Sequence, residues 1–173
     1  MLSDFTALQL QIEESLQQHL PTNSQIAQPM LNAMTYAVMG GGKRLRPMLV
    51  CAGSEAFGGD YSKALPAGCA FEFIHAYSLI HDDLPAMDDD DLRHGRPSTH
   101  VAFGEANAIL AGDSLHSLAF QSISEAANIS PTSKLSIIAL LSKAAGWPGM
   151  SGGQCLDIEA EGKALSLSEL EVL

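Results

Sequence analysis

Hydrophobic residues recur along most of this chain at intervals of three and four, the spacing typical of amphipathic helices. Near the start, Phe5, Leu8, Ile12 and Leu16 follow this spacing and predict a first helix, which Pro21 helps to end. The same pattern predicts further helices over residues 28–38, 46–57, 65–84, 104–127, 132–145 and 149–160, and a last one that starts near Ser166.

The segment 65–84 is apolar nearly all round, which is typical of a buried central helix. Val, Ile and Thr are sparse and alternation with a period of two is rare, so no sheet is expected. Neither an internal repeat nor a low-complexity linker divides the sequence. We therefore predict an all-α fold, a bundle of long packed helices in a single domain over residues 1–173.

The end of the sequence suggests that this bundle is incomplete at its C-terminus. Ser166 and Glu169 have the spacing of a capping box, yet only one or two helical turns fit before Leu173. Such short helices are marginal on their own. We expect the 173 residues to be the N-terminal part of a larger domain.

Composition narrows the class of protein. A net charge of −11 argues against nucleic acid and anionic membranes as partners. No apolar run reaches membrane-spanning length, and the acidic N-terminal segment does not resemble a signal peptide. Cys51, Cys69 and Cys155 are scattered without metal-binding spacing, which favours reduced thiols. A soluble, cytoplasmic protein is expected.

The most unusual stretch is HDDLPAMDDDDLRHGRP, residues 81–97, with six aspartates in ten positions. Two carboxylates ~4 Å apart repel by about 4 kcal/mol at a protein surface, so these groups must splay into water, take up protons or hold cations. Pro85 should end or kink the preceding helix, which lets Asp88 return towards Asp82 and Asp83. Magnesium takes one or two carboxylates and completes its octahedron with substrate phosphates. The three aspartates therefore predict a magnesium site, with a solvated acidic loop as the alternative.

The predicted helix before the aspartates also carries polar side chains on one face. Phe71, His75, Ser78 and Asp82 fall at intervals of four, three and four, which predicts one stripe along a helix face. An EF-hand is excluded, because the twelfth residue from Asp88 is a threonine and not a bidentate glutamate.

A second candidate site is GGGKRLRP, residues 40–47. Glycines let the backbone approach an anion, the following helix offers N–H groups, and Lys43, Arg44 and Arg46 add positive charge. It is not a Walker motif, since no Ser or Thr follows the lysine and no strand precedes the glycines. The alternative is a helix-connecting turn with solvated basic side chains.

Together these blocks resemble the trans-prenyltransferase (polyprenyl synthetase) family, closest to its bacterial farnesyl diphosphate synthases. The resemblance rests on GGKRLRP, FEFIHAYSLIHDD, the DDxxxxD spacing, GEANAILAGDSL and GGQCLDIEAEGK. It implies an isoprenoid-synthase bundle and a Mg²⁺-dependent (Mn²⁺ possible) condensation of isopentenyl diphosphate with dimethylallyl or geranyl diphosphate through an allylic cation. It also implies a homodimer.

The resemblance assigns roles to particular residues. Asp82, Asp83 and Asp88 match the magnesium ligands, and Arg93 matches a residue that grips the allylic diphosphate. Binding of isopentenyl diphosphate is implied for Lys43, Arg46 and His75, and an allylic-end role for Gln154 and Asp157. His19, His116, Glu105 and Asp113, outside these motifs, are expected to cap helices, pack or lie at the surface.

One departure from the family pattern lies at His94, which stands where a second arginine usually binds isopentenyl diphosphate. Imidazole titrates near neutrality and lacks the bidentate fork, so weaker isopentenyl binding is expected. Arg96, two residues on, is a candidate to compensate. The family's second aspartate-rich motif would lie beyond Leu173, so the 173 residues alone are expected to be inactive.

Product length should depend on Tyr77 and Ser78, five and four residues before Asp82. An aromatic residue at the fifth position resembles enzymes that stop at fifteen carbons. Alternatives are a geranylgeranyl diphosphate synthase, a non-catalytic partner subunit, a terpene cyclase and a plain metal-binding module. A cyclase handles one diphosphate and would not need GGKRLRP, whereas a partner subunit usually loses its aspartates. A search for a second DDxxD motif further along the reading frame would distinguish a prenyl diphosphate synthase from these alternatives.

Overall fold

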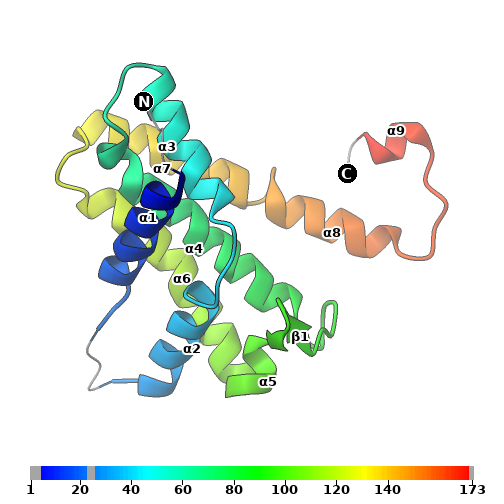
Figure 1. Ribbon diagram of the computed structural model, residues 1–173. Helices are drawn as coiled ribbons and strands as arrows, with labels where there is room; N and C mark the ends of the chain where they lie inside the picture. Colours follow the sequence, from blue (N-terminus) through cyan, green and yellow to red (C-terminus); the bar gives the residue numbers. More distant parts are fainter. Residues whose placement is uncertain (1–4, 23–25, 172–173) are drawn as a thin grey trace. The chain divides into compact units, whose positions relative to one another are not determined.

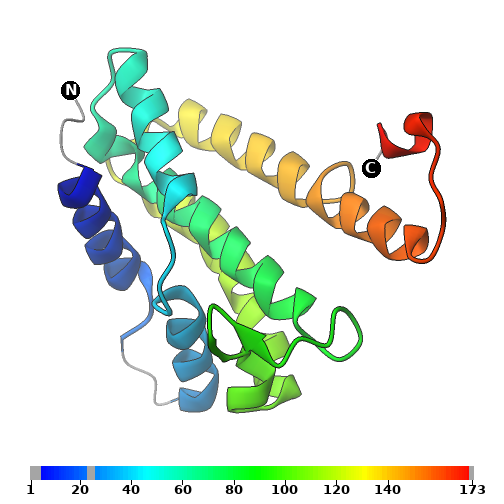
Figure 2. The same ribbon diagram turned by 45° about the vertical axis from the view of Figure 1, so that its right-hand side comes forward.

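The apolar segment in the middle of the chain forms helix α4, Leu65–Asp82 (Figure 1). This structure, a computed structural model, describes residues 5–22 and 26–171. Helix α6, Glu105–Glu125, lies side by side with α4 in Figures 1 and 2. Phe73 of α4 and Leu115 of α6 have no exposed surface. The prediction that segment 65–84 is a buried central helix is therefore confirmed.

The chain separates into two compact units, Met1–Ser130 and Pro131–Leu173. In the first unit, α1 and α3 pack on α4, while α2 packs on α6 and on a short helix, α5. Besides α4 and α6, this unit contains α1 Phe5–His19, α2 Gln28–Val38, α3 Leu45–Ala56, the 3-10 turn η1 Tyr61–Ala64, β1 Leu92–Arg93, β2 Arg96–Pro97 and α5 Thr99–Phe103. The second unit consists of α7 Pro131–Ala145, α8 Met150–Ala160 and α9 Leu167–Leu170. The all-α fold class is confirmed, and the single-domain organisation stays a prediction.

Local sequence signals explain most helix ends. α4 ends at Asp82, three residues before Pro85, because proline cannot donate a backbone hydrogen bond and crowds the preceding turn. At the start of α9, Ser166 and Glu169 form the predicted capping box, in which the Ser166 N–H donates to Glu169 Oε2 at 2.8 Å. The predicted apolar stripe of α1 is wrong at one residue, because Phe5 is 68% exposed.

A small antiparallel pair corrects the expectation that the chain has no strands. β1 and β2 pair Leu92 with Pro97 and Arg93 with Arg96. Between them, His94 and Gly95 have φ of 53° and 75°, the positive values that a two-residue type I′ turn requires. Strands of two residues are too short to show a period of two, so the hydrophobic pattern could not reveal them.

The three cysteines are free thiols, and burial raises the pKa of Cys51 and of Cys69 to about 11. None of the helices in the described part of the chain is long and apolar enough to cross a membrane.

Candidate active site

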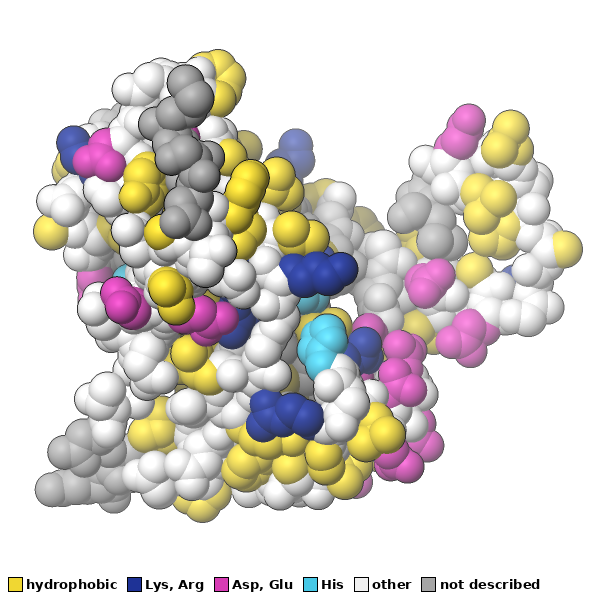
Figure 3. Space-filling view, in the orientation of Figure 1, with side chains coloured by type: hydrophobic (Ala, Val, Ile, Leu, Met, Phe, Trp, Pro, Cys, Tyr) yellow, Lys and Arg dark blue, Asp and Glu magenta, His cyan; other side chains and the backbone are white. Residues whose placement is uncertain are grey.

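A pocket of about 330 Å³ opens in the first unit, where the glycine–basic turn, α4 and the β1–β2 hairpin meet. Its volume is at the lower end of the range of small-molecule sites. Five of its lining residues are Lys or Arg, in a chain whose net charge is −11. Figure 3 shows basic and histidine side chains gathered on one face, beside a group of acidic side chains. The pocket is lined by residues 36–38, 40–46, 72, 75, 76, 79, 80, 83, 93, 94 and 96–99.

The glycine–basic turn lines one side of this pocket. Gly41 and Gly42 have φ of 105° and 125°, in the left-handed region that favours glycine. Lys43 and Arg46 are exposed and line the pocket, and neither forms an ion pair with a described carboxylate. Two cations at the start of a helix, without an ion pair among the described residues, could together bind an anion.

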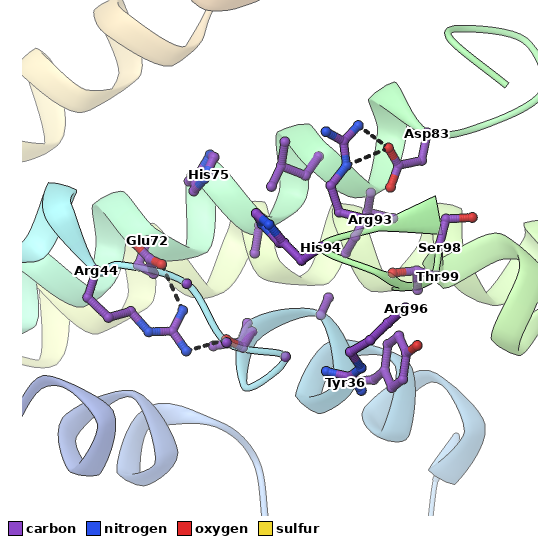
Figure 4. Close-up of a pocket in the computed structure, with 18 of the residues that line it drawn as sticks. Tyr36, Arg44, Glu72, His75, Asp83, Arg93, His94, Arg96, Ser98 and Thr99 are labelled. Carbon is purple, nitrogen blue, oxygen red and sulfur yellow. Dashed lines mark hydrogen bonds and ion pairs between the residues drawn. The ribbon is translucent and has the colours of Figure 1, made fainter. Parts of the chain in front are cut away.

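Arg44, which the sequence grouped with these cations, is turned inwards. Its Nη1 donates to Glu72 Oε1 at 2.8 Å (Figure 4). Its Nε donates to Glu13 Oε1 at 2.7 Å, and its Nη2 to the Val38 carbonyl at 2.8 Å. The side chain is only 3% exposed. Burial alone would lower the pKa of Arg44, but the bonds to both glutamates outweigh it and raise the pKa. Arg44 therefore crosslinks α1, α4 and the turn, and its donors are taken by protein groups.

At the other side of the pocket, the end of α4 carries the aspartates. Asp83 is 2% exposed and its Oδ1 accepts hydrogen bonds from Arg93, including one from Nε at 2.9 Å. This contact raises the pKa of Arg93. The Asp88 N–H donates to the Asp82 carbonyl at 2.9 Å, so the loop returns to the helix end as predicted.

The donor chemistry of this helix end fits a magnesium ion that shares its coordination with a substrate. Within residues 5–22 and 26–171, no three His, Cys, Asp or Glu side chains converge as a metal-ligand group. Magnesium does not need such a cage, because it binds through one or two carboxylates, waters and substrate phosphates. Asp82, Asp83 and Asp88 supply hard oxygen donors, and the Arg93 guanidinium is the cation that now faces Asp83.

The face of α4 that lines the pocket differs from the predicted stripe. It carries Glu72, His75, Leu79 and Asp83, whereas of the stripe Phe71, His75, Ser78 and Asp82 only His75 lines the pocket. Successive helix residues point ~100° apart, so Asp82 and Asp83 face different directions. Burial and the nearby Arg46 lower the pKa of His75, which favours its neutral form.

The hairpin brings three further residues to the pocket. Figure 4 shows Arg93 extending towards Asp83 and Arg96 towards Tyr36, with His94 between them. The Arg96 guanidinium carbon lies 4.0 Å from the centre of the Tyr36 ring. Sequence reasoning overlooked Tyr36 as a site residue, because nothing local links it to the hairpin. It also overlooked Glu72, which was visible as the one carboxylate in the apolar stretch before the aspartates.

The predicted chain-length residues lie outside this pocket. The Tyr77 ring contacts the rings of His81 and of His116 of α6 edge-on, with ring centres 4.9 Å and 5.0 Å apart. The His116 ring in turn contacts Phe120, with ring centres 5.3 Å apart. Ser78 donates to the His75 carbonyl at 2.9 Å. Tyr77 therefore contacts α6, in a row of rings distinct from the basic pocket.

Two predicted site residues belong to the second unit. Gln154 and Asp157 lie on α8, where Gln154 is half-buried and Asp157 exposed. Their predicted role stays a prediction. Of the residues expected to pack or lie at the surface, His116 packs against Tyr77 and Phe120, while the Asp113 side chain is 63% exposed.

Comparison with known proteins gives consistent matches. The family model described as polyprenyl synthetase matches residues 27–172. A farnesyl diphosphate synthase of Geobacillus stearothermophilus is 54% identical over 143 residues, 82% of this chain and 48% of that protein. Geranylgeranyl pyrophosphate synthase 7, chloroplastic, of Arabidopsis thaliana is 42% identical over 172 residues, 98% of this chain and 50% of that protein. The chain thus spans about half the length of the curated relatives it matches.

Among solved structures, the crystal structure of a geranyltransferase from Legionella pneumophila is similar with a TM-score of 0.91 and 38% identity. That similarity covers 97% of this chain and 60% of the other chain.

Proposed function

The chain belongs to the polyprenyl synthetase family, and from this premise we propose that the full-length protein is a short-chain prenyl diphosphate synthase. Its substrates are isopentenyl diphosphate and an allylic diphosphate, either dimethylallyl or geranyl diphosphate. Its product is farnesyl diphosphate. The farnesyl diphosphate synthase from Geobacillus stearothermophilus, with 54% identity, supports this choice.

The observation that carries the proposal is the pairing of two unlike anion positions in one pocket. At one end, Lys43 and Arg46 offer positive charge, and neither has an acidic partner in the part of the chain that the structure describes. At the other end, Asp83 and Arg93 combine a buried carboxylate with a cation. In the proposed condensation, one diphosphate binds at the aspartate end through metal and the other binds at the end that carries Lys43 and Arg46.

In this proposal each group has a defined task. Arg93 binds the allylic diphosphate, and its charge stabilises the group as the C–O bond breaks and the diphosphate leaves with the electron pair. Asp82, Asp83 and Asp88 would hold magnesium, which would supply further positive charge to neutralise that diphosphate. Lys43, Arg46 and His75 orient isopentenyl diphosphate so that its double bond attacks the allylic cation. The adduct then loses one proton to the released pyrophosphate, and the new double bond completes the prenyl chain.

A direct assay tests this function. The full-length protein, incubated with isopentenyl and geranyl diphosphates and magnesium, should release inorganic pyrophosphate and form farnesyl diphosphate, identified by mass spectrometry. Removal of magnesium with a chelator should stop the reaction. Absence of any prenyl product would reject the proposal, whereas a twenty-carbon product would favour the geranylgeranyl alternative, which the Arabidopsis relative supports.

We expect Tyr77→Ala to lengthen the product. Tyr77 fills space between α4 and α6 against His81 and His116, and its removal opens room for a longer chain. The product distribution, measured by mass spectrometry, should shift beyond fifteen carbons. His19→Ala, a change on α1 where the ring Nδ1 is hydrogen-bonded to the Ser15 carbonyl at 2.7 Å, is the control. An unchanged distribution in Tyr77→Ala would contradict the chain-length role.

The remaining proposals concern the whole protein. They are a role for Gln154 and Asp157 in binding the allylic substrate, and the assembly of two copies into a homodimer that acts in the cytoplasm. Sedimentation of the full-length protein tests the dimer, and a monomer at assay concentration would exclude it.

A further inference from the structure

Arg96 is held in the pocket by a local structure of its own. Its guanidinium carbon lies 4.0 Å from the Tyr36 ring centre, within reach of a cation–π contact. Tyr36 is itself fixed, because its hydroxyl donates to the Pro97 carbonyl at 2.8 Å and its ring meets Phe103 edge-on at 5.2 Å. Gly40 leaves the space, since a Cβ there would lie 2.7 Å from Arg96 Nη1.

The charge of Arg96 has no acidic partner among the described residues. Arg44 and Arg93, its neighbours in the pocket, pair with Glu72 and Asp83. Arg96 stands directly opposite Arg93 in the β1–β2 register, an arrangement of like charges that is unfavourable unless each finds an anion. Arg93 forms an ion pair with Asp83. For Arg96 the described residues supply no such anion, which leaves its guanidinium available to one that enters the pocket.

Arg96 lies nearer to the end of the pocket formed by the glycine–basic turn than to the end that carries the aspartates. Its Nη1 approaches Gly40, at the start of the turn that carries Lys43 and Arg46, whereas Arg93 reaches away from it to Asp83 (Figure 4). His94, between the two arginines, offers an imidazole with neither a permanent charge nor a fork. A cation–π contact through the Arg96 guanidinium carbon uses none of the N–H donors of the guanidinium, which can donate to phosphate oxygens.

We propose that Arg96, held on Tyr36 in the space left by Gly40, binds the diphosphate of isopentenyl diphosphate together with Lys43 and Arg46. This inference rests on the proposed function and adds a substrate-binding residue to it. At the end of the pocket that carries Lys43 and Arg46, the third cation is then Arg96 and not the residue at position 94.

The test uses full-length protein with Arg96→Met and Arg96→Lys, and Lys63→Met as the control that removes an exposed cation outside the pocket. Isopentenyl diphosphate binding is measured by calorimetry without magnesium, and KM for both substrates is measured with it. Arg96→Met should weaken isopentenyl binding about ten- to hundredfold, the usual effect of losing charged hydrogen bonds. The kcat and the KM for geranyl diphosphate should stay unchanged.

Arg96→Lys separates charge from geometry. It should recover part of the lost affinity, because lysine keeps the charge but not the stacked planar fork. Thermal unfolding of each variant shows that the fold persists. If Arg96→Met folds and binds isopentenyl diphosphate like wild type, or loses both substrates equally, the inference is wrong while the proposed function stands. If the wild-type protein itself binds no isopentenyl diphosphate, the proposed function fails instead.

Discussion

Asp83→Asn should lower kcat with an allylic diphosphate by about 10²–10³-fold, the usual range for losing one group that stabilises developing charge. The Asp83 carboxylate is buried at the pocket end of α4, where it offers an oxygen donor for magnesium and holds Arg93. An amide removes the negative charge that attracts both cations. Magnesium-dependent binding of geranyl diphosphate, measured by calorimetry, should weaken in parallel.

Asp89→Asn provides a matched control for this variant. It makes the same chemical change six residues further on, at an exposed side chain for which the described structure shows no ion pair. Asp89 has a φ of 54°, a conformation that asparagine also tolerates, so the loop should keep its shape. Asp89→Asn should retain wild-type kcat. If Asp83→Asn bound geranyl diphosphate with the same magnesium dependence as wild type, the proposed metal end would be wrong.

The long helices and the location of both motifs could be predicted from sequence because their signals are local. Segment 28–38 matches α2 at both ends, since a proline near the start and glycines beyond the end set its limits. Helix α4 ends two residues before the predicted limit at residue 84, because the effect of Pro85 begins in the turn before it. The apolar surface of α4 likewise predicted its burial.

The direction of each pocket side chain could not be predicted, because it depends on residues far away in sequence. Arg44 resembles Lys43 and Arg46 in the string of letters, yet its φ of 50° and its two glutamate partners turn it inwards. The stacking of Arg96 likewise depends on Tyr36, a residue of another helix. A run of basic residues thus predicts an anion site but not which members face it.

Because Arg44 is buried and paired whereas Lys43 and Arg46 are exposed, its replacement should have a large effect on stability. We expect Arg44→Met to lower the free energy of unfolding by about 3–5 kcal/mol, the range for removing one partner of a buried ion pair. The change leaves Glu72, whose side chain is 8% exposed, with an uncompensated charge, and releases Glu13 and the Val38 carbonyl. Urea unfolding of the full-length protein, followed by circular dichroism, measures the loss.

Arg46→Met separates stability from binding. It is the same substitution two residues on, at an exposed side chain without an acidic partner in the described structure, so the free energy of unfolding should change by less than about 0.5 kcal/mol. Binding of isopentenyl diphosphate should nevertheless weaken in Arg46→Met. In the Arg44→Met background, Glu72→Gln should restore part of the stability, because it removes the stranded charge. Equal stability of Arg44→Met and Arg46→Met would show that the inward ion pairs of Arg44 do not hold the turn.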